Sequence, residues 1–442
     1  MKQIKRAFTI GVFLVGALGF SQKKWTLQES INHALENNIT IKKAENTLLI
    51  NDEDITAAKG SFLPTVSGSA SHSISLGQSQ LFEGAFVNRT SNSTNFGVRV
   101  SENIFNGFRN TYLYEQAKLN LETSQLELSR IQDDISLNVA NSYLNALFNK
   151  EQLETAITQF EFSKKQLSQV KDLVEAGTQP KVNIYDAEAT LANDEQAVTV
   201  AENNYNLALL SLSQLLQVPF EGFDIEVIEI DSPSEALLYN NASPILEYAL
   251  QNRSEIGIAE KNIENSELNT KISKAGFLPS VNFGYSLGAN VFYTNLNDNE
   301  NPFFRQLEDN LGHNFNLSVN IPIFSQFQNK TNVAKSLIQE ENAKLDLEQA
   351  KLTLESNIQA AFTDAQAAFK TYEAAKKSLA SQELAFENAQ ERYNIGAMNA
   401  FELEQSRVRY INAQSSLITA KYDFVFKTKV LDFYMGKTIT ID

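Results

Sequence analysis

Residues 59–76 read KGSFLPTVSGSASHSISL, a Phe-Leu-Pro motif followed by a stretch in which every second residue is serine. This period of two predicts a β-strand from Val66 to Leu76, with the serines on one face and mainly apolar side chains on the other. The serine face is small and uncharged, which favours a strand whose apolar face contacts lipid. The alternative is a soluble antiparallel sheet with one face packed on a core.

The Phe-Leu-Pro motif occurs a second time. KGSFLPTV at 59–66 returns as KAGFLPSV at 274–281, and ALEN at 34–37 returns at the same interval as ALQN at 249–252. Further matches share a second, slightly longer interval: Asn95-Phe96 with Asn314-Phe315, Ile104-Phe105 with Ile323-Phe324, and Gly177 with Gly396. A spacing that holds over such distances, with a small insertion, predicts an internal two-fold repeat.

The repeat sets the expected domain organisation. We divide the chain into a first repeat at residues 22–221, a linker at residues 222–243, a second repeat at residues 244–436 and a C-terminal tail at residues 437–442. Each repeat is expected to contain a short helix, two β-strands and a long helical hairpin. Prolines and glycines interrupt the helical periodicity at the linker.

Alternation of the same kind predicts three more strands, at residues 96–104, 281–291 and 314–323. Prolines are expected at strand entry: Pro64, Pro279 and Pro322. Aromatic side chains cluster near the predicted strand ends, as in the interfacial girdles of membrane barrels: Phe82, Phe86, Phe292, Tyr293, Phe303 and Phe304. Four strands do not close into a barrel, and open sheet edges are unstable in hydrocarbon. We therefore expect the strands of at least two chains to join.

Composition excludes several classes of protein. The 442 residues include no Cys and 3 His, which removes disulfide scaffolds, thiolate metal sites, cysteine nucleophiles and a lipid-modified cysteine. The formal charge of −16 argues against a nucleic-acid partner, because phosphate binding requires clustered Lys and Arg. Gly-rich phosphate loops, a His-Glu-x-x-His motif and a nucleophile elbow are not found, so we expect no enzyme activity, cofactor or metal site.

Residues 1–21 have the pattern of a secretory signal peptide. Lys2, Lys5 and Arg6 precede a short apolar stretch, and small residues follow it before Gln22. The apolar run is shorter than the ~20 residues of a spanning helix, which disfavours the alternative of an N-terminal anchor. Later segments are not apolar enough for a transmembrane helix, so entry into a membrane would require strands.

Two very long helices are expected at residues 110–175 and 330–395, because neither stretch contains Pro or Gly before its end. At 1.5 Å per residue each would extend roughly 100 Å. Each is followed by a glycine turn, Gly177-Thr178-Gln179-Pro180 or Gly396-Ala397-Met398-Asn399, and returns as a helix at residues 182–216 or 401–433. Apolar residues spaced three and four apart suit long antiparallel coiled-coil packing. A rod-like spacer is the alternative for these segments alone.

This arrangement resembles the TolC family of outer-membrane efflux proteins over nearly the whole mature chain. The most specific pieces are Ala34-Leu35-Glu36-Asn37-Asn38, the two Phe-Leu-Pro motifs, Ile321-Pro322-Ile323-Phe324 and Tyr393-Asn394-Ile395-Gly396. The resemblance implies an α+β membrane protein, in which three chains form one transmembrane β-barrel, with four strands from each chain, and a long antiparallel α-helical barrel. It implies a location in the outer membrane of a Gram-negative bacterium, in contact with outer-membrane lipid and extending into the periplasm. It also implies that the linker at residues 222–243 lies in the equatorial region of the helical part.

The resemblance also implies a function, passive passage of substrates through the exit duct of a tripartite efflux or type I secretion system. A periplasmic adaptor and an inner-membrane pump would be its partners. The competing hypothesis is a trimeric adhesin or structural protein with a barrel anchor and a coiled-coil stalk. Strand pairs that recur with helices on both sides disfavour it, because an adhesin anchor usually gathers its strands at one end of the chain.

Candidate site residues follow from the same resemblance. The tip turns, with Gly177, Thr178, Gly396 and Ala397, would contact the adaptor. Glu402 matches the first acid of the family's aperture ring, whereas Gln405 stands where a second acid is often found. The remaining candidates are Asn183 at an acidic gating position, Asp186 one turn further on, and Tyr393, which matches a tyrosine of the closing network. A carboxylate ring would favour cations. The alternative is that Glu402 and Asp186 are solvated helix charges.

Overall fold

The computed structural model describes residues 24–227, 239–297, 300–437 and 439, so the predicted signal peptide at residues 1–21 lies outside the described residues. The chain divides into two compact units. The sheet unit contains residues 39–132 and 243–359, and the hairpin unit contains residues up to 38, residues 133–242 and residues from 360 onward. Two helices contribute to both units, α3 (Arg109–Glu175) and α8 (Gln328–Asn394).

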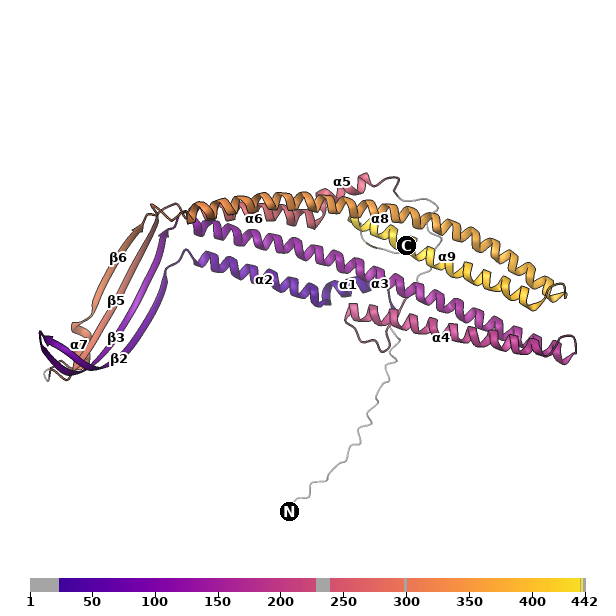
Figure 1. The fold of residues 1–442 in the computed structure, drawn as a ribbon, viewed down its shortest axis with the longest axis horizontal. Helices are drawn as coiled ribbons and strands as arrows, with labels where there is room; N and C mark the ends of the chain where they lie inside the picture. Colours follow the sequence, from indigo (N-terminus) through magenta and orange to yellow (C-terminus); the bar gives the residue numbers. More distant parts are fainter. Residues whose placement is uncertain (1–23, 228–238, 298–299, 438, 440–442) are drawn as a thin grey trace, which may run out of the picture. The chain divides into compact units, whose positions relative to one another are not determined.

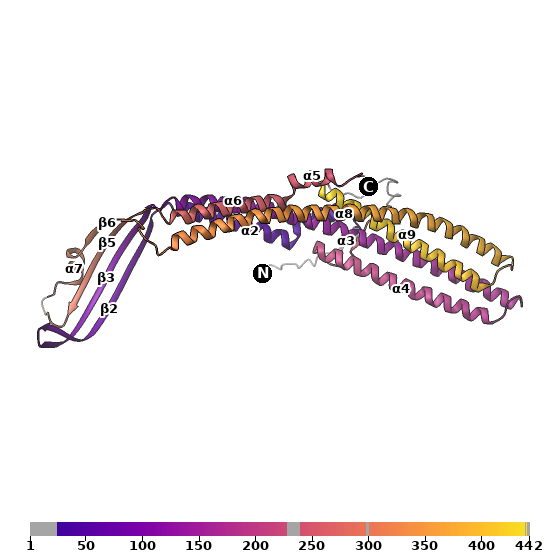
Figure 2. The ribbon, with the colours of Figure 1, turned by 45° about the horizontal axis from the view of Figure 1, so that its top comes forward.

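The sheet unit is built around one four-stranded antiparallel sheet with the order β2-β3-β5-β6 (Figures 1 and 2). Its strands are β2 (Thr65–Phe82), β3 (Ala85–Phe105), β5 (Ser280–Thr294) and β6 (Gly312–Asn320). The short helix α7 (Phe303–Asp309) lies between β5 and β6 in the chain. The helical part of this unit includes α2 (Ile39–Gly60), α5 (Ser243–Asn252) and α6 (Ser254–Ala275).

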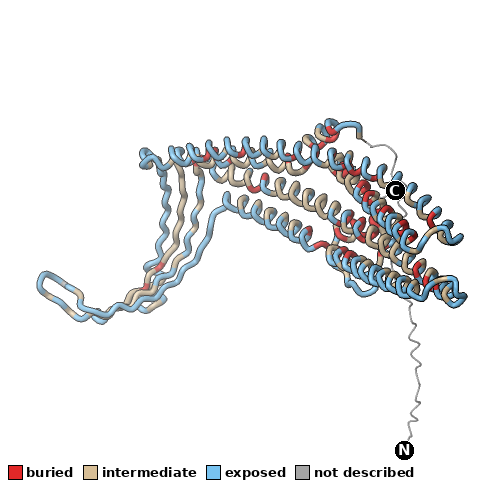
Figure 3. The backbone as a smooth tube through the Cα atoms, turned by 45° about the vertical axis from the view of Figure 1, so that its right-hand side comes forward, coloured by how far each residue is buried: buried red, intermediate tan, exposed pale blue. Residues whose placement is uncertain are grey.

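The strand register gives the sheet two chemically different faces. Val66 pairs with Val100, Val100 with Tyr285 and Tyr285 with Phe315, so apolar side chains line up across the strands. Many of them are exposed in the single chain: Val66, Ile74, Leu76, Phe315, Leu317 and Val319 (Figure 3). The opposite face, which we call the polar face, carries the alternating serines of β2 and their cross-strand partners. Ala289 and Val291 are buried, and the Phe96 ring contacts Phe303 of α7, so only part of the apolar face is covered within the chain. The large exposed remainder requires a further partner.

The lengths of three strands differ clearly from the prediction. β2 and β3 extend to a turn at Glu83-Gly84 and are 18 and 21 residues long, because hydrogen-bonded pairing continues well beyond the clearest alternation. β6 ends at Asn320 although the alternation continues to Ile323. Pro322 has no backbone N–H to donate to a neighbouring strand, which is consistent with the ladder ending before it.

The segment before each Phe-Leu-Pro motif also differs, because it forms two helices where one was predicted. α1 (Leu27–Asn37) and α2 are separated at Asn38, whose φ of −60° and ψ of 129° are extended. α5 and α6 are separated at Arg253, which is also extended. Thr26 begins α1 with a capping box, in which its side chain accepts from the N–H of Glu29 and the Glu29 carboxylate accepts from the N–H of Thr26.

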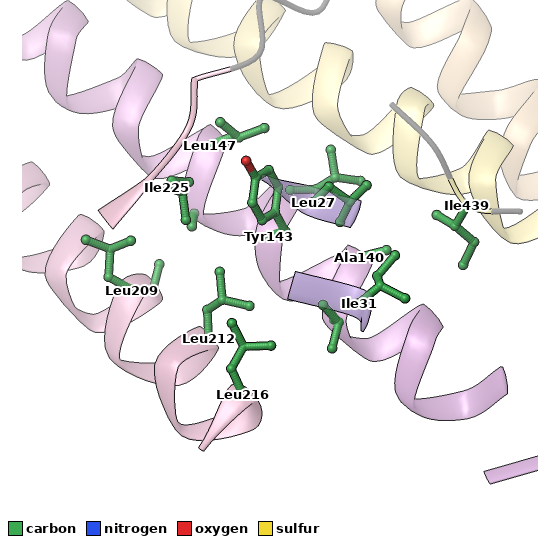
Figure 4. Packing of buried hydrophobic residues seen from close by; sticks show 14 of the residues in the cluster. Leu27, Ile31, Ala140, Tyr143, Leu147, Leu209, Leu212, Leu216, Ile225 and Ile439 are labelled. Carbon is green, nitrogen blue, oxygen red and sulfur yellow. The ribbon is translucent and has the colours of Figure 1, made fainter. Parts of the chain in front are cut away.

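The main core of the hairpin unit gathers segments distant in the sequence. α1, α3, α4 (Val182–Leu216) and α9 (Ala400–Tyr434) contribute to one hydrophobic cluster (Figure 4). Two short strands, β1 (Lys24–Trp25) and β4 (Asp224–Ile225), pair in parallel beside it. The hydroxyl of the fully buried Tyr143 lies 3.0 Å from the carbonyl oxygen of Trp25 and 2.8 Å from that of Glu226, so it ties both strands to α3.

Equivalent elements recur along the chain at nearly constant distances. α2 begins at Ile39 and α6 at Ser254, and the interval from the start of β2 to the start of β5 is the same. The interval from the start of α3 to the start of α8 is slightly longer. The observed bounds of the long helices lie close to those predicted. Among the residues that the structure describes, no helix is both long and apolar enough to span a membrane.

Candidate functional site at the hairpin turns

The two glycine turns of the hairpin unit have the same backbone geometry. Gly177 has a φ of 73° and Gly396 a φ of 76°, in the left-handed region that favours glycine. The N–H of Thr178 donates to the Leu173 carbonyl, and the N–H of Gly177 donates to that of Val174. In the second turn the N–H of Ala397 donates to the Arg392 carbonyl, and the N–H of Gly396 donates to the Tyr393 carbonyl. Each long helix therefore ends in a Schellman motif, which explains glycine at both positions.

A relay of polar side chains links the two turns. The amide of Gln179 in the first turn donates to the Tyr393 hydroxyl at the end of α8, at 3.2 Å. The amide of Asn183 in α4 donates to the Gln179 Oε1, also at 3.2 Å. Two residues predicted separately, Asn183 and Tyr393, are thus joined through a third that sequence analysis did not single out. Gln179 belongs to the turn motif, but only the fold brings it to a residue 214 positions away.

A cavity of about 300 Å³ brings three predicted residues together. Asn183, Asp186 and Tyr393 line it with Phe401 and Glu404. Glu402 and Gln405 do not line this cavity. Glu402 and Gln405 are both exposed in the single chain. The five predicted aperture residues thus fall into a cavity-lining group and a pair outside the cavity.

Glu402 also has a local role in its helix. It occupies the first turn of α9, where its N–H bonds to the Asn399 side chain at 2.9 Å. Its carboxylate lies near the positive end of the helix dipole, which favours a negative charge. The position therefore stabilises the start of α9 and leaves the carboxylate accessible.

A buried charge cluster near this cavity was not predicted. Arg407 in α9, with only 4% of its side chain exposed, forms an ion pair with Asp194 in α4 at 3.0 Å and another with Glu404 at 2.9 Å. Its guanidinium also donates to the Ser163 hydroxyl of α3 at 3.2 Å, and that hydroxyl donates to Asp194. The cluster therefore joins three helices from both hairpins. Its only sequence signal is the Glu404–Arg407 spacing of three residues, which is common on helices.

Arg407 contributes a fixed positive charge at this position. Burial alone lowers the pKa of its guanidinium, but hydrogen bonds to Glu404 and Asp194 and the attraction of their carboxylates outweigh burial, so the pKa is raised. The two carboxylates neutralise the charge of the guanidinium, so Arg407 is not available to bind a charged solute. The arrangement holds α3, α4 and α9 together.

The strand-entry prolines have different positions from one another. Pro64 and Pro279 come directly before β2 and β5, as predicted. Pro322 follows β6, so its assignment to a strand entry is wrong; it lies between the strand and α8. Within the described part of the chain, no group of three or more His, Asp or Glu side chains has the geometry of a metal site.

Comparison with known families agrees with the observed architecture. The family model described as outer membrane efflux protein matches residues 30–217 and 245–437, which include both long hairpins and all four strands of the sheet. This chain belongs to the outer membrane efflux protein family. The match begins again beyond the predicted linker, and the comparisons do not support the adhesin alternative.

Individual relatives are distant but nearly full-length. Outer membrane protein TolC of Vibrio cholerae serotype O1 is 20% identical over 434 residues, 96% of this chain and 94% of the relative. Among solved structures, CusC has a TM-score of 0.77 at 18% identity, covering 93% of this chain and 92% of its own. The Campylobacter jejuni CmeC outer membrane channel has a TM-score of 0.75 at 18% identity, and the match covers 100% of this chain and 95% of CmeC. These two similarities establish the fold of this outer membrane efflux protein.

Proposed function

We propose that this outer membrane efflux protein is one protomer of a trimeric exit duct, through which substrates pass passively from the periplasm to the outside. The observation that carries the proposal is the incomplete sheet. β2 and β6 each lack a neighbour on one side within the described part of the chain, and much of the apolar face is exposed. Edge strands must be paired in lipid, so the sheet is complete only when copies join. Three copies would supply one barrel of twelve strands.

Family membership supports the remaining parts of the proposal. Outer membrane efflux proteins work with pumps and adaptors, and the relatives are outer membrane proteins. In this duct the long hairpins would form the α-helical barrel in the periplasm, and the turns at Gly177 and Gly396 would contact a periplasmic adaptor. An inner-membrane pump would supply the energy, and residues 1–21 would direct export. The duct itself would perform no reaction.

The aperture of the duct is proposed to lie at the hairpin turns. The relay Tyr393–Gln179–Asn183 links the two turns of one protomer, and Asp186 lines the cavity beside it. Glu402 is exposed in the single chain, where it remains available to face the pore or a neighbouring protomer. Three copies of Glu402 would form a carboxylate ring that favours cations.

Ion selectivity tests this assignment in trimers reconstituted into planar bilayers. Glu402→Gln is expected to reduce the preference for cations while channels still form, because only the ring charge is removed. Glu308→Gln, an exposed acid of α7 in the sheet unit, is the matched control and should leave the preference unchanged. An unchanged cation preference in Glu402→Gln would remove Glu402 from the aperture.

A cellular experiment tests the duct itself. Deletion of the gene is expected to sensitise cells to an exported compound while leaving adhesion intact, and the intact gene should restore resistance. Loss of adhesion with normal resistance would contradict the exit-duct function.

A further inference from the structure

The polar face of the sheet has an unusual distribution of charge for so acidic a chain. The register places Ser, Thr, Asn and Gly at most of its positions, with Val87 and Phe292 as the apolar exceptions. The charged residues at these positions are Arg89 and Arg99, and no Asp or Glu of the described strands shares the face. The whole chain, in contrast, has 53 acidic and 37 basic residues. The face is therefore locally basic.

Arg99 lies in the middle of a row of small polar residues. Ser67 of β2 pairs with Arg99, Arg99 pairs with Ser286 of β5, and Ser286 pairs with Asn314 of β6. The adjacent row contains Ser69 and the glycines of the other three strands: Gly97, Gly288 and Gly312. Small neighbours leave space around the guanidinium, and none of them neutralises it.

A hollow of about 390 Å³ lies at the same place on the face. Arg99 lines it together with Asn282, Asn314 and Asn316 and with the serines Ser101 and Ser286. Arg99 forms no ion pair with any residue that the structure describes. A guanidinium without a carboxylate partner, next to amide and hydroxyl donors, matches the hydrogen-bonding requirements of an oxyanion.

We propose that Arg99 forms an anion-binding site on the lumen face of the barrel and favours solutes that carry carboxylate, sulfonate or phosphate groups. The inference rests on the proposed function, because the polar face lines the lumen only when the apolar face contacts lipid. Three protomers would place a ring of Arg99 guanidinium groups in the barrel wall. The ring is opposite in sign to the carboxylate ring proposed at the hairpin turns.

The absence of cysteine from the chain allows a direct measurement of the local potential. A single thiol is introduced by Ser286→Cys, at the position paired with Arg99. Reconstituted trimers are treated with an anionic sulfonatoethyl methanethiosulfonate or with its cationic trimethylammonioethyl analogue. The ratio of the two modification rates is measured with Arg99 intact, with Arg99→Gln and with Arg99→Lys.

The expected result is a ratio that falls about fivefold in Arg99→Gln, since a charge about 8 Å away affects the two reagents in opposite directions. Arg99→Lys should retain most of the ratio. A thiol from Asn95→Cys, further along β3 and about 13 Å away, should show a smaller change, because salt screens over about 8 Å. Inorganic phosphate at constant ionic strength should slow the anionic reagent at Ser286→Cys only while Arg99 is present.

A ratio that does not change in Arg99→Gln, or that changes equally at both thiols, overturns the proposal. Failure of the exit-duct function has a different signature, because the parent protein would then produce no conducting trimers. Conducting trimers whose thiol responds equally to both reagents would refute the anion site alone.

Discussion

Two arginines in this chain have opposite surroundings. Arg407 in the hairpin unit is buried and pairs with Asp194 and Glu404, and it also bonds Ser163. Arg99 in the sheet unit lies among serines, glycines and asparagines on an open face and forms no ion pair with a described residue. Arg407 holds helices together through ion pairs, whereas Arg99 keeps an unneutralised positive charge. The difference lies in whether the neighbouring segments supply carboxylates.

The largest expected effect on the free energy of unfolding comes from removing the ion pairs of Arg407. Arg407→Met leaves two carboxylates without a cation, and the Asp194 side chain is only 14% exposed. Breaking such a buried pair from one side costs about 3–5 kcal/mol. Denaturant unfolding of the purified protein should show the loss, and hydrogen exchange should localise it to α4 and α9.

Two controls define this effect. Arg407→Lys keeps the charge but loses the forked geometry, so it should give an intermediate loss. Lys351→Ala removes an exposed pair with Glu348 and should cost less than about 1 kcal/mol. If Arg407→Met and Lys351→Ala lowered the free energy of unfolding by the same small amount, the ion pairs of Arg407 would not hold the hairpins together.

Tyr143→Phe is expected to have the next largest effect. Its single hydroxyl proton is shared between the carbonyl oxygens of Trp25 and Glu226, so the substitution removes a buried donor. The Trp25 carbonyl keeps the N–H of Glu226 as a partner. The expected cost is about 1–3 kcal/mol, measured as a shift in the unfolding midpoint. An unchanged unfolding midpoint would mean that the Tyr143 hydroxyl does not stabilise the packing of β1 and β4.

The same tyrosine predicts a dependence on alkaline pH. Burial, together with the negative charges of Glu226 and Asp224, raises the pKa of Tyr143 above its ordinary value of 10. The folded state therefore favours the neutral phenol. Its contribution is fully present below about pH 10 and is lost as the pH rises toward the folded-state pKa, because the unfolded phenol ionises first. Unfolding measured between about pH 8 and pH 11 should show a shallower alkaline loss in Tyr143→Phe than in the parent protein.

Alanine at the hairpin turns is expected to have a smaller effect. Gly177→Ala and Gly396→Ala each force a side chain into the left-handed region, at a cost of about 1–2 kcal/mol. Gly60→Ala, at the end of α2, has no positive φ and open space around the new Cβ, so it should be neutral or slightly stabilising. Equal costs at Gly60 and Gly177 in thermal unfolding would contradict the conformational explanation.

The smallest expected effect on stability is that of Arg99→Gln. Because Arg99 has no ion pair to lose among the described residues, its replacement should change the free energy of unfolding by less than about 0.5 kcal/mol. The contrast with Arg407→Met in the same unfolding experiment is the sharpest form of the comparison. A loss of several kcal/mol at Arg99 would show that it has a structural partner.

Local pattern was sufficient to predict the main elements of this fold. Uninterrupted helical composition indicated the bounds of α3, α4, α8 and α9, and strict alternation located the strands, because both patterns depend on residues close in sequence. The end of β6 and the break at Asn38 were missed, since hydrogen-bond pairing and tertiary context determine them.

The side-chain networks were not predictable in the same way. Gln179 meets Tyr393 across 214 residues, and Arg407 meets Asp194 across 213. Neither pairing leaves a periodic signal in the sequence, because each depends on how two hairpins lie beside each other. The domain boundaries and the assignment of Glu402, Asp186 and Gln405 to an aperture remain predictions.

Single-channel recording of the purified full-length protein in planar lipid bilayers tests the central claim most directly. A duct formed by joined copies of this chain predicts discrete conductance steps of one size, which appear only after protein is added. A membrane that stays at its baseline conductance, with protein inserted and folded, would contradict the exit-duct function.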